Sequence, residues 1–146
     1  MVSLEIILDT MALVMYRLLQ MGFETASGDE VILLGLLSLC YNIFLQWCDG
    51  KLAYLHFPST YKNCLLDPQL TSSCASQIII WLLMVGGISI FTASDDRGLK
   101  HSLQEHVVIC KVKSWGEMRD ILKSFMWIDL LHDGPGKHIF DSILTL

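Results

Sequence analysis

The stretch that decides the fold extends from Ile78 to Leu131 and reads IIIWLLMVGGISIFTASDDRGLKHSLQEHVVICKVKSWGEMRDILKSFMWIDLL. An uncharged apolar run ends in a Gly-Gly pair and a polar break at Ser94-Asp95-Asp96, and a second segment follows. Apolar residues that recur every three or four positions indicate a helix with one buried face. The stretch therefore predicts a helix over about 74–92, capped by Ser72 or Ser73, and another over about 96–111. The buried face of the second comprises Leu99, Leu103, Val107 and Cys110.

A capping box marks the start of the next helix at Ser114. In Ser114-Trp115-Gly116-Glu117 the serine hydroxyl and the glutamate carboxylate accept reciprocal backbone hydrogen bonds. We expect this helix to keep Arg119, Asp120 and Lys123 outside. Its buried face comprises Trp115, Met118, Ile121, Leu122, Phe125 and Ile128. His132-Asp133-Gly134 is expected to end the helix, and Pro135 to open a final helix that reaches about Leu146.

Two further helical patterns lie in the first half of the chain. Val2–Met21 has apolar residues at helical spacing without a convincing N-terminal cap, and Gly22 is a stop signal. Ser27, followed by two acidic residues, predicts the start of a helix over about 31–48 that Asp49-Gly50 ends. Both patterns add to an all-helical domain.

The periodicity fades between Lys51 and Leu70, where Pro58 and Pro68 interrupt the chain. These residues predict an irregular crossover with a short helix near 61–66. Residues 1–146 are thus expected to form a single all-α domain, an irregular bundle of about six helices with no strand.

The composition excludes some functions. Of the 146 residues 53% are apolar and 17% charged, the formal net charge is −5, and the mean hydropathy is +0.50. Direct contact with DNA is not expected, because the basic residues are scattered singly and phosphate contacts need a basic face. The apolar excess indicates either membrane-facing surface or apolar faces that a partner or another part of the same protein covers.

The five cysteines, an odd number, form no C-x-x-C pair, so neither a zinc module nor a disulfide scaffold is indicated. Cys40 and Cys110 lie in apolar helical patterns and are interpreted as small core residues, which fits a reducing compartment. The N-terminus carries Glu5 and Asp9 where a secretory signal would be basic, so no signal peptide is predicted.

Two groups of polar residues are candidates for a catalytic or metal site. His101, Glu105 and His106 follow an H-x-x-x-E-H pattern, which is not the zinc-binding H-x-x-E-H, and are interpreted as solvated helix residues. The trio Asp129, His132 and Asp133 could serve acid–base chemistry. The preferred interpretation is structural: the trio lies at a helix C-terminus beside a proline-initiated helix, where the helix dipole favours His132 and Asp133 can act as a cap.

Other candidates are interpreted as packing residues. No phosphate-binding pattern follows Gly86-Gly87, so these glycines are expected to allow close contact with a neighbouring helix. The tryptophans are interpreted as core anchors: Trp47, Trp81, Trp115 and Trp127. We therefore expect no catalytic, cofactor-binding or metal-binding residue in this chain.

A small integral membrane protein with two or more spans is the alternative. Val31–Cys48 is uncharged over a length near that of a span, whereas Ile78–Ala93 is short for one. Against a span, the first run contains Asn42 and Gln46 and lacks basic flanks. Burial between helices of the protein is preferred for both runs.

The order of the pieces resembles a known family. Trp81-Leu82-Leu83 with Val85-Gly86-Gly87, then Ser114-Trp115 with Glu117, then Phe125, Trp127 and Asp129 before Asp133 and Gly136, is similar to the C-terminal regulatory region of fungal-specific transcription factors. The similarity covers about 78–140. Gly98-Leu99 stands where that family often has an aromatic residue.

This resemblance implies a non-enzymatic, nuclear regulatory domain that acts through a protein partner, self-association or a small inducer. It also implies a binuclear zinc cluster with six cysteines in a separate N-terminal region, so zinc is not expected in this chain. The chain is accordingly expected to be a partial domain of a truncated regulator.

Overall fold

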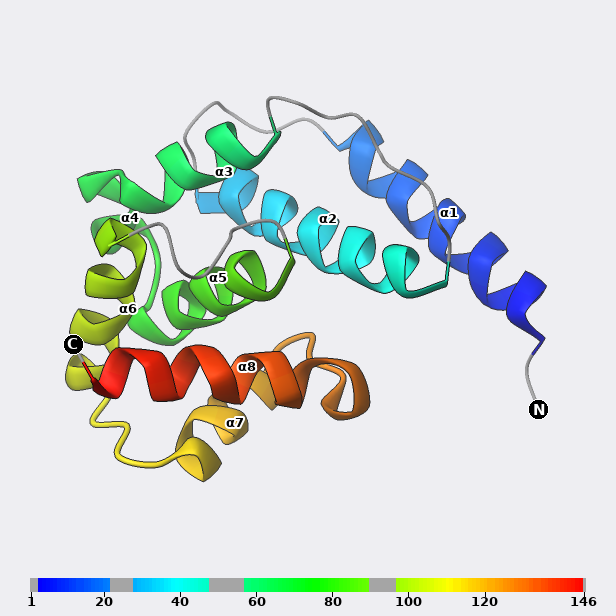
Figure 1. Ribbon diagram of the computed structural model, residues 1–146. Coiled ribbons are helices and arrows are strands. Elements are labelled where there is room, and N and C mark those ends of the chain that lie inside the picture. Colours follow the sequence, from blue (N-terminus) through cyan, green and yellow to red (C-terminus); the bar gives the residue numbers. More distant parts are fainter. Residues whose placement is uncertain (1–2, 22–27, 48–56, 90–96, 146) are drawn as a thin grey trace.

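The computed structural model describes residues 3–21, 28–47, 57–89 and 97–145, and these contain eight helices and no strand (Figure 1). The helices are α1 (Leu4–Gln20), α2 (Gly28–Trp47), α3 (Phe57–Leu66), α4 (Pro68–Ser73), α5 (Ser76–Ser89), α6 (Arg97–Ile109), α7 (Trp115–Lys123) and α8 (Asp129–Leu144). The all-α prediction is confirmed. The crossover holds α3 and α4 rather than one short helix, which raises the number from about six to eight in the described residues.

Helix α5 forms the centre of the molecule. It lies between α2 and α3 on one side and α7 and α8 on the other, with α6 across its N-terminal end (Figure 1). Eight successive residues are buried: Ile79, Ile80, Trp81, Leu82, Leu83, Met84, Val85 and Gly86. A helix that is apolar on all sides has to be enclosed by other elements. The uncharged run at 78–89 is thus covered by protein.

Small residues allow the neighbours of α5 to approach closely. A Cβ atom added at Gly35 of α2 would lie 2.6 Å from Leu82, and one at Gly87 would lie 2.8 Å from Ile139 of α8. The expected packing role of the Gly86-Gly87 pair is therefore confirmed at Gly87. Tyr61 of α3 is fully buried and donates a hydrogen bond from its hydroxyl group to the Leu82 carbonyl oxygen.

Helix α1 packs on α2 and forms a small apolar cluster there, in which Leu18 contacts Leu37 and Cys40. Ser3 caps α1, since its hydroxyl accepts the Ile6 N–H, which corrects the expectation of a helix without an N-terminal cap. The expected signals at Gly22, Ser27 and Asp49-Gly50 lie outside the described residues.

The predicted cap of the central apolar helix is wrong. Ser72 and Ser73 do not cap the next helix but belong to α4, and α5 begins at Ser76. Helix α4 begins because the Asp67 side chain accepts the Gln69 N–H and Pro68 stands at the first helical position. A cap followed by proline is a local signal, although the six residues of α4 are too few to show periodicity.

The end of the capping-box helix is also corrected. Ser114 accepts the Glu117 N–H as predicted, but the Glu117 carboxylate accepts the N–H of Lys113, the residue before the cap. Helix α7 ends at Lys123, not at His132-Asp133-Gly134. Pro135 does not open the last helix and lies inside α8.

The two uncharged runs behave as expected for buried helices where side chains are described. In α2, Val31, Leu34, Leu39 and Cys40 are buried, as are the central residues of α5. Among the described residues, no helix combines the length and the apolar character that crossing a bilayer requires. Cys40 is a core residue as predicted, Cys110 is partly buried against the core, and both thiols are free.

Candidate functional site

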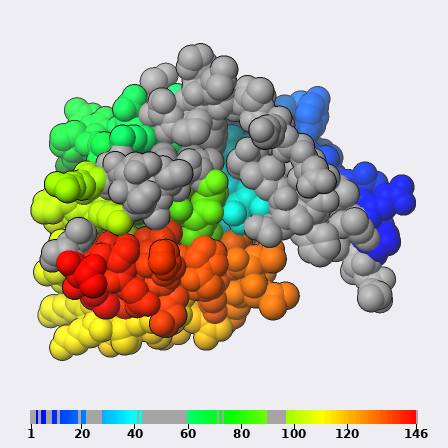
Figure 2. Space-filling view, viewed as in Figure 1, coloured from blue at the N-terminus to red at the C-terminus, as the bar shows by residue number. Residues whose placement is uncertain are grey.

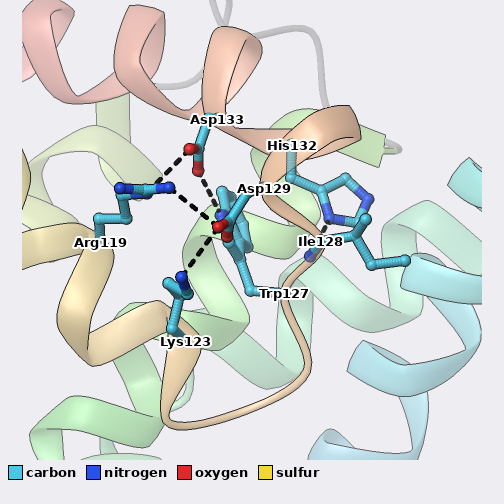
Figure 3. A network of polar contacts seen from close by, with 7 residues as sticks. All are labelled: Arg119, Lys123, Trp127, Ile128, Asp129, His132 and Asp133. Atoms are coloured by element: carbon cyan, nitrogen blue, oxygen red, sulfur yellow. Dashed lines mark hydrogen bonds and ion pairs between the residues drawn. The ribbon is translucent and has the colours of Figure 1, made fainter.

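A group of polar side chains gathers where α7 leads into α8 (Figure 3). We call this group the junction cluster; it consists of Arg119, Lys123, Trp127, Asp129, His132 and Asp133. Arg119 and Lys123 project from α7 one helical turn apart, and Asp129 and Asp133 project from α8 with the same spacing. Two rows of opposite charge therefore face each other across the loop.

Arg119 bridges both carboxylates. Its Nη2 lies 2.9 Å from Asp129 Oδ2 and its Nε lies 2.9 Å from Asp133 Oδ2. The second contact is an ion pair without hydrogen-bond geometry, and Asp129 Oδ1 accepts no hydrogen bond from the described residues. Lys123 Nζ adds a contact of 2.8 Å to Asp129 Oδ2. One guanidinium group thus ties the first turn of α8 to α7.

The cations keep Asp129 ionised. Its pKa is lowered mainly by the hydrogen bond from Lys123, with further lowering by the positive charge of Arg119. A carboxylate that two cations stabilise is a weak base. Asp129 is therefore poorly suited to accept a proton near neutral pH.

His132 is fully buried and has both ring nitrogens engaged. The Ile128 N–H donates to Nδ1 at 3.0 Å, which requires Nδ1 to be unprotonated. Nε2 must then carry the hydrogen and donate it to Asn42 Oδ1 at 3.2 Å, while Asn42 Nδ2 donates to the Ile88 carbonyl oxygen. This directed chain joins the start of α8 to α2 and α5 and assigns the Nε2–H tautomer.

Burial lowers the pKa of His132, and the nearby Asp133 carboxylate opposes that shift. Protonation would place a second hydrogen on Nδ1, directly against the Ile128 N–H. His132 is consequently a neutral structural residue that replaces the missing cap of α8, since Ile128 offers no side-chain cap.

Trp127 completes the cluster from the loop between the two helices. Its Nε1 donates to Asp133 Oδ1 at 2.9 Å, and its ring lies against His132 and over Gly136. The loop is fixed from the other side as well, because Trp81 Nε1 donates to the Met126 carbonyl oxygen at 2.8 Å. These contacts explain why the chain turns here instead of continuing α7.

The structure brings the predicted trio together but changes its place. Asp129, His132 and Asp133 lie in the first turns of α8, not at the C-terminus of the preceding helix. The contacts of the trio stabilise the N-terminal end of α8 rather than the C-terminal end of the preceding helix. Sequence reasoning missed Arg119 and Lys123, although the matched four-residue spacing of the two charged pairs was visible.

The other polar candidates are separated. His101 Nε2 lies 3.2 Å from Glu105 Oε1 on the exposed side of α6, whereas His106 is buried and lies 3.3 Å from the hydroxyl oxygen of Ser76. The two histidines point away from each other as expected, but the interpretation of His106 as a solvated residue is wrong. Burial lowers the pKa of His106, partly offset by Glu105.

The tryptophans anchor the core where the structure describes them. Trp81 and Trp127 are buried, Trp115 packs against Phe140 with ring centroids 6.0 Å apart, and the Trp47 side chain lies outside the described residues. Trp127 occupies a loop, which corrects its expected place on a helix.

Beside the junction cluster, three apolar side chains are exposed to solvent. Met126, Ile128 and Leu130 have exposed fractions of 54%, 38% and 94%, and we call them the junction patch. Ile128 was expected on a buried helix face and instead precedes α8. The backbone on which the patch stands is held by the Trp81 and His132 hydrogen bonds.

Within the described residues, no group of three or more His, Cys, Asp or Glu side chains is arranged to hold a metal ion. Comparison of the chain with protein-family models, with curated proteins and with solved structures gives no match.

Proposed function

We propose that this chain is a non-enzymatic regulatory and interaction domain of a transcription-factor-like protein, and that the junction patch is its docking surface for a protein partner. The observation that carries the proposal is a contrast between neighbours. Each polar side chain of the junction cluster has a hydrogen-bond or ion-pair partner within the fold, whereas the apolar residues of the junction patch face solvent.

An acid–base role has little support in the cluster. Asp129 and Asp133 are paired with Arg119, and the lone pair of His132 Nδ1 is occupied by the Ile128 N–H. A general base needs a free lone pair within reach of a substrate proton. The same contacts instead hold the loop in one conformation.

A rigid apolar patch favours binding of a partner. An exposed fraction of 94% for Leu130 is costly for a free protein and favourable once a partner covers the side chain. Because the loop backbone is already fixed, little conformational entropy is lost on binding. Met126 and Ile128, close to Leu130 in the sequence and also exposed, are proposed to take part in the same contact.

The transcriptional part of the proposal rests on the sequence resemblance over about 78–140. By that resemblance the domain works in the nucleus, responds to a partner or small inducer, and leaves DNA binding to a zinc cluster in a separate region. The net charge of −5 supports the proposal that this chain does not contact DNA directly.

The test is a tethering experiment. The full chain is fused to a heterologous DNA-binding domain in fungal cells, and transcription of a reporter with matching sites is measured. We expect the fusion to change reporter output and Leu130→Glu to abolish that change. Val108→Glu is the matched control, because Val108 is also exposed, with an exposed fraction of 70%, but lies on α6.

Equal fusion levels, checked by immunoblotting, are required for the comparison. An unchanged reporter output with the wild-type chain would contradict a regulatory function. Equal loss with L130E and V108E would contradict the junction patch as the docking surface.

A further inference from the structure

Helix α1 has a second apolar face that the described part of the chain leaves uncovered. Leu18 lies on the face that packs on α2 and is buried. On the opposite side, Ile6, Leu13 and Tyr16 have exposed fractions of 57%, 57% and 59%. Figure 2 shows the atoms of α1 at one edge of the molecule, far from α6 and the C-terminal end of α8.

The charges on this outer face are arranged symmetrically about Leu13. Asp9 precedes Leu13 by four residues, Arg17 follows it by four, and both are exposed. At 1.5 Å per residue the two charges lie about 6 Å from Leu13 in opposite directions along the helix, rotated about 40° to either side. Asp9, Leu13 and Arg17 thus form one continuous row of side chains.

Such a row is complementary to its own antiparallel copy. If two α1 helices meet with Leu13 against Leu13, Asp9 of each chain lies beside Arg17 of the other. Rows of residues four apart commonly pack side by side, with the helices crossing at roughly 50°. In a parallel pair Asp9 would face Asp9 and Arg17 would face Arg17, which opposes that orientation.

We propose that the outer face of α1 is a self-association surface, and that two copies of this chain pair through antiparallel α1 helices about a two-fold axis at Leu13. The occupant is a second copy because the charge pattern matches its own reversal. An interface of this kind is closed, since each chain supplies the same patch. The inference does not depend on the junction patch, which lies on other helices.

The first test is the oligomeric state of the full chain by sedimentation equilibrium over a concentration series. We expect a reversible dimer, and Asp9→Arg or Arg17→Asp alone to weaken it on the order of tenfold or more, because each creates two like-charge contacts. The double variant D9R/R17D restores the opposite-charge pairs and is expected to restore the dimer. A monomeric wild-type chain, or a double variant no better than the single ones, would overturn the proposal.

Cysteine cross-linking tests the orientation. Leu13→Cys places two thiols at the two-fold axis and is expected to give a disulfide-linked dimer under mild oxidation. Ile6→Cys is the matched control on the same face: in the antiparallel pair its two copies lie about 21 Å apart along the helices and cannot bond. The chain without either substitution also contains free cysteines, so its own cross-linking is measured as the baseline. Cross-linking of I6C as strongly as L13C would refute the antiparallel arrangement.

Discussion

The Trp127 ring lies so close to Gly136 that a Cβ atom added to this glycine would stand 2.8 Å from Cζ2 of Trp127. Trp115 approaches the same position to 3.0 Å. Gly136 therefore lets α8 pass beneath two indole rings. This close contact keeps Trp127 over the start of α8, where it reaches Asp133.

Substitution of this glycine is expected to destabilise the fold. Gly136→Ala forces the rings away and should lower the free energy of unfolding by about 1–3 kcal/mol, as overpacking does. Gly134→Ala in the same helix is the control, because its Cβ meets nothing within 4 Å apart from its chain neighbours. Its gain in helix propensity is offset by crowding of the new methyl group against Pro135, so the free energy of unfolding should change by less than about 1 kcal/mol. Urea denaturation of both variants measures the difference. Equal effects would contradict the close packing at Gly136.

Arg119 is expected to contribute more to the free energy of unfolding than Lys123. Arg119→Ala frees α8 from α7, and because the guanidinium is 40% exposed we expect a modest loss of about 1 kcal/mol. Lys123→Ala removes one outer contact and should cost a few tenths of that value. Arg119→Lys should also lower the free energy of unfolding, because a single ammonium group cannot span both carboxylates.

Thermal or urea unfolding at low and high salt checks this ranking. Salt screens the ion pairs and should reduce the difference in free energy of unfolding between wild type and R119A. A larger loss in K123A than in R119A would contradict the bridging role of Arg119.

Two buried histidines are expected to make stability fall on acidification. Burial lowers the pKa of His106 and His132, so below about pH 6.5 the unfolded chain binds protons that the folded chain does not. Their contribution is complete above that pH and is lost as pH falls toward the folded-state pKa values. The slope is at most about 1.4 kcal/mol per pH unit for each histidine.

Denaturant midpoints measured from about pH 7.5 to about pH 5.5 test this expectation. His132→Gln should lower stability at the upper end and flatten the pH dependence. A stability that rises on acidification, or a slope that H132Q leaves unchanged, would show that protonation of His132 is not linked to unfolding.

The helices that are specified by residues close together in the sequence were predicted well. The apolar run around Trp81 and the capping box at Ser114 each consist of residues that are adjacent in the sequence. The structure has a buried helix at the first and a capped helix start at the second. The prediction that Pro135 begins a helix was wrong because this proline lies inside α8, a position at which proline is usually unfavourable.

The candidate site was harder to predict because its partners are distant in the chain. Asn42 and His132 are separated by 90 positions, and no local pattern links them. The trio of Asp129, His132 and Asp133 was visible in the sequence, but its role depends on which residues face it. Only the fold brings Arg119 to both carboxylates.

The central claim is that the junction cluster is structural and that His132 is held neutral as a hydrogen-bonded link between helices. The most direct test is the nitrogen NMR spectrum of the His132 ring near neutral pH. We predict a neutral ring with the proton on Nε2 and an unprotonated Nδ1 that accepts the Ile128 N–H. A charged ring, or a neutral one with its proton on Nδ1, would contradict the account and return the trio to acid–base chemistry.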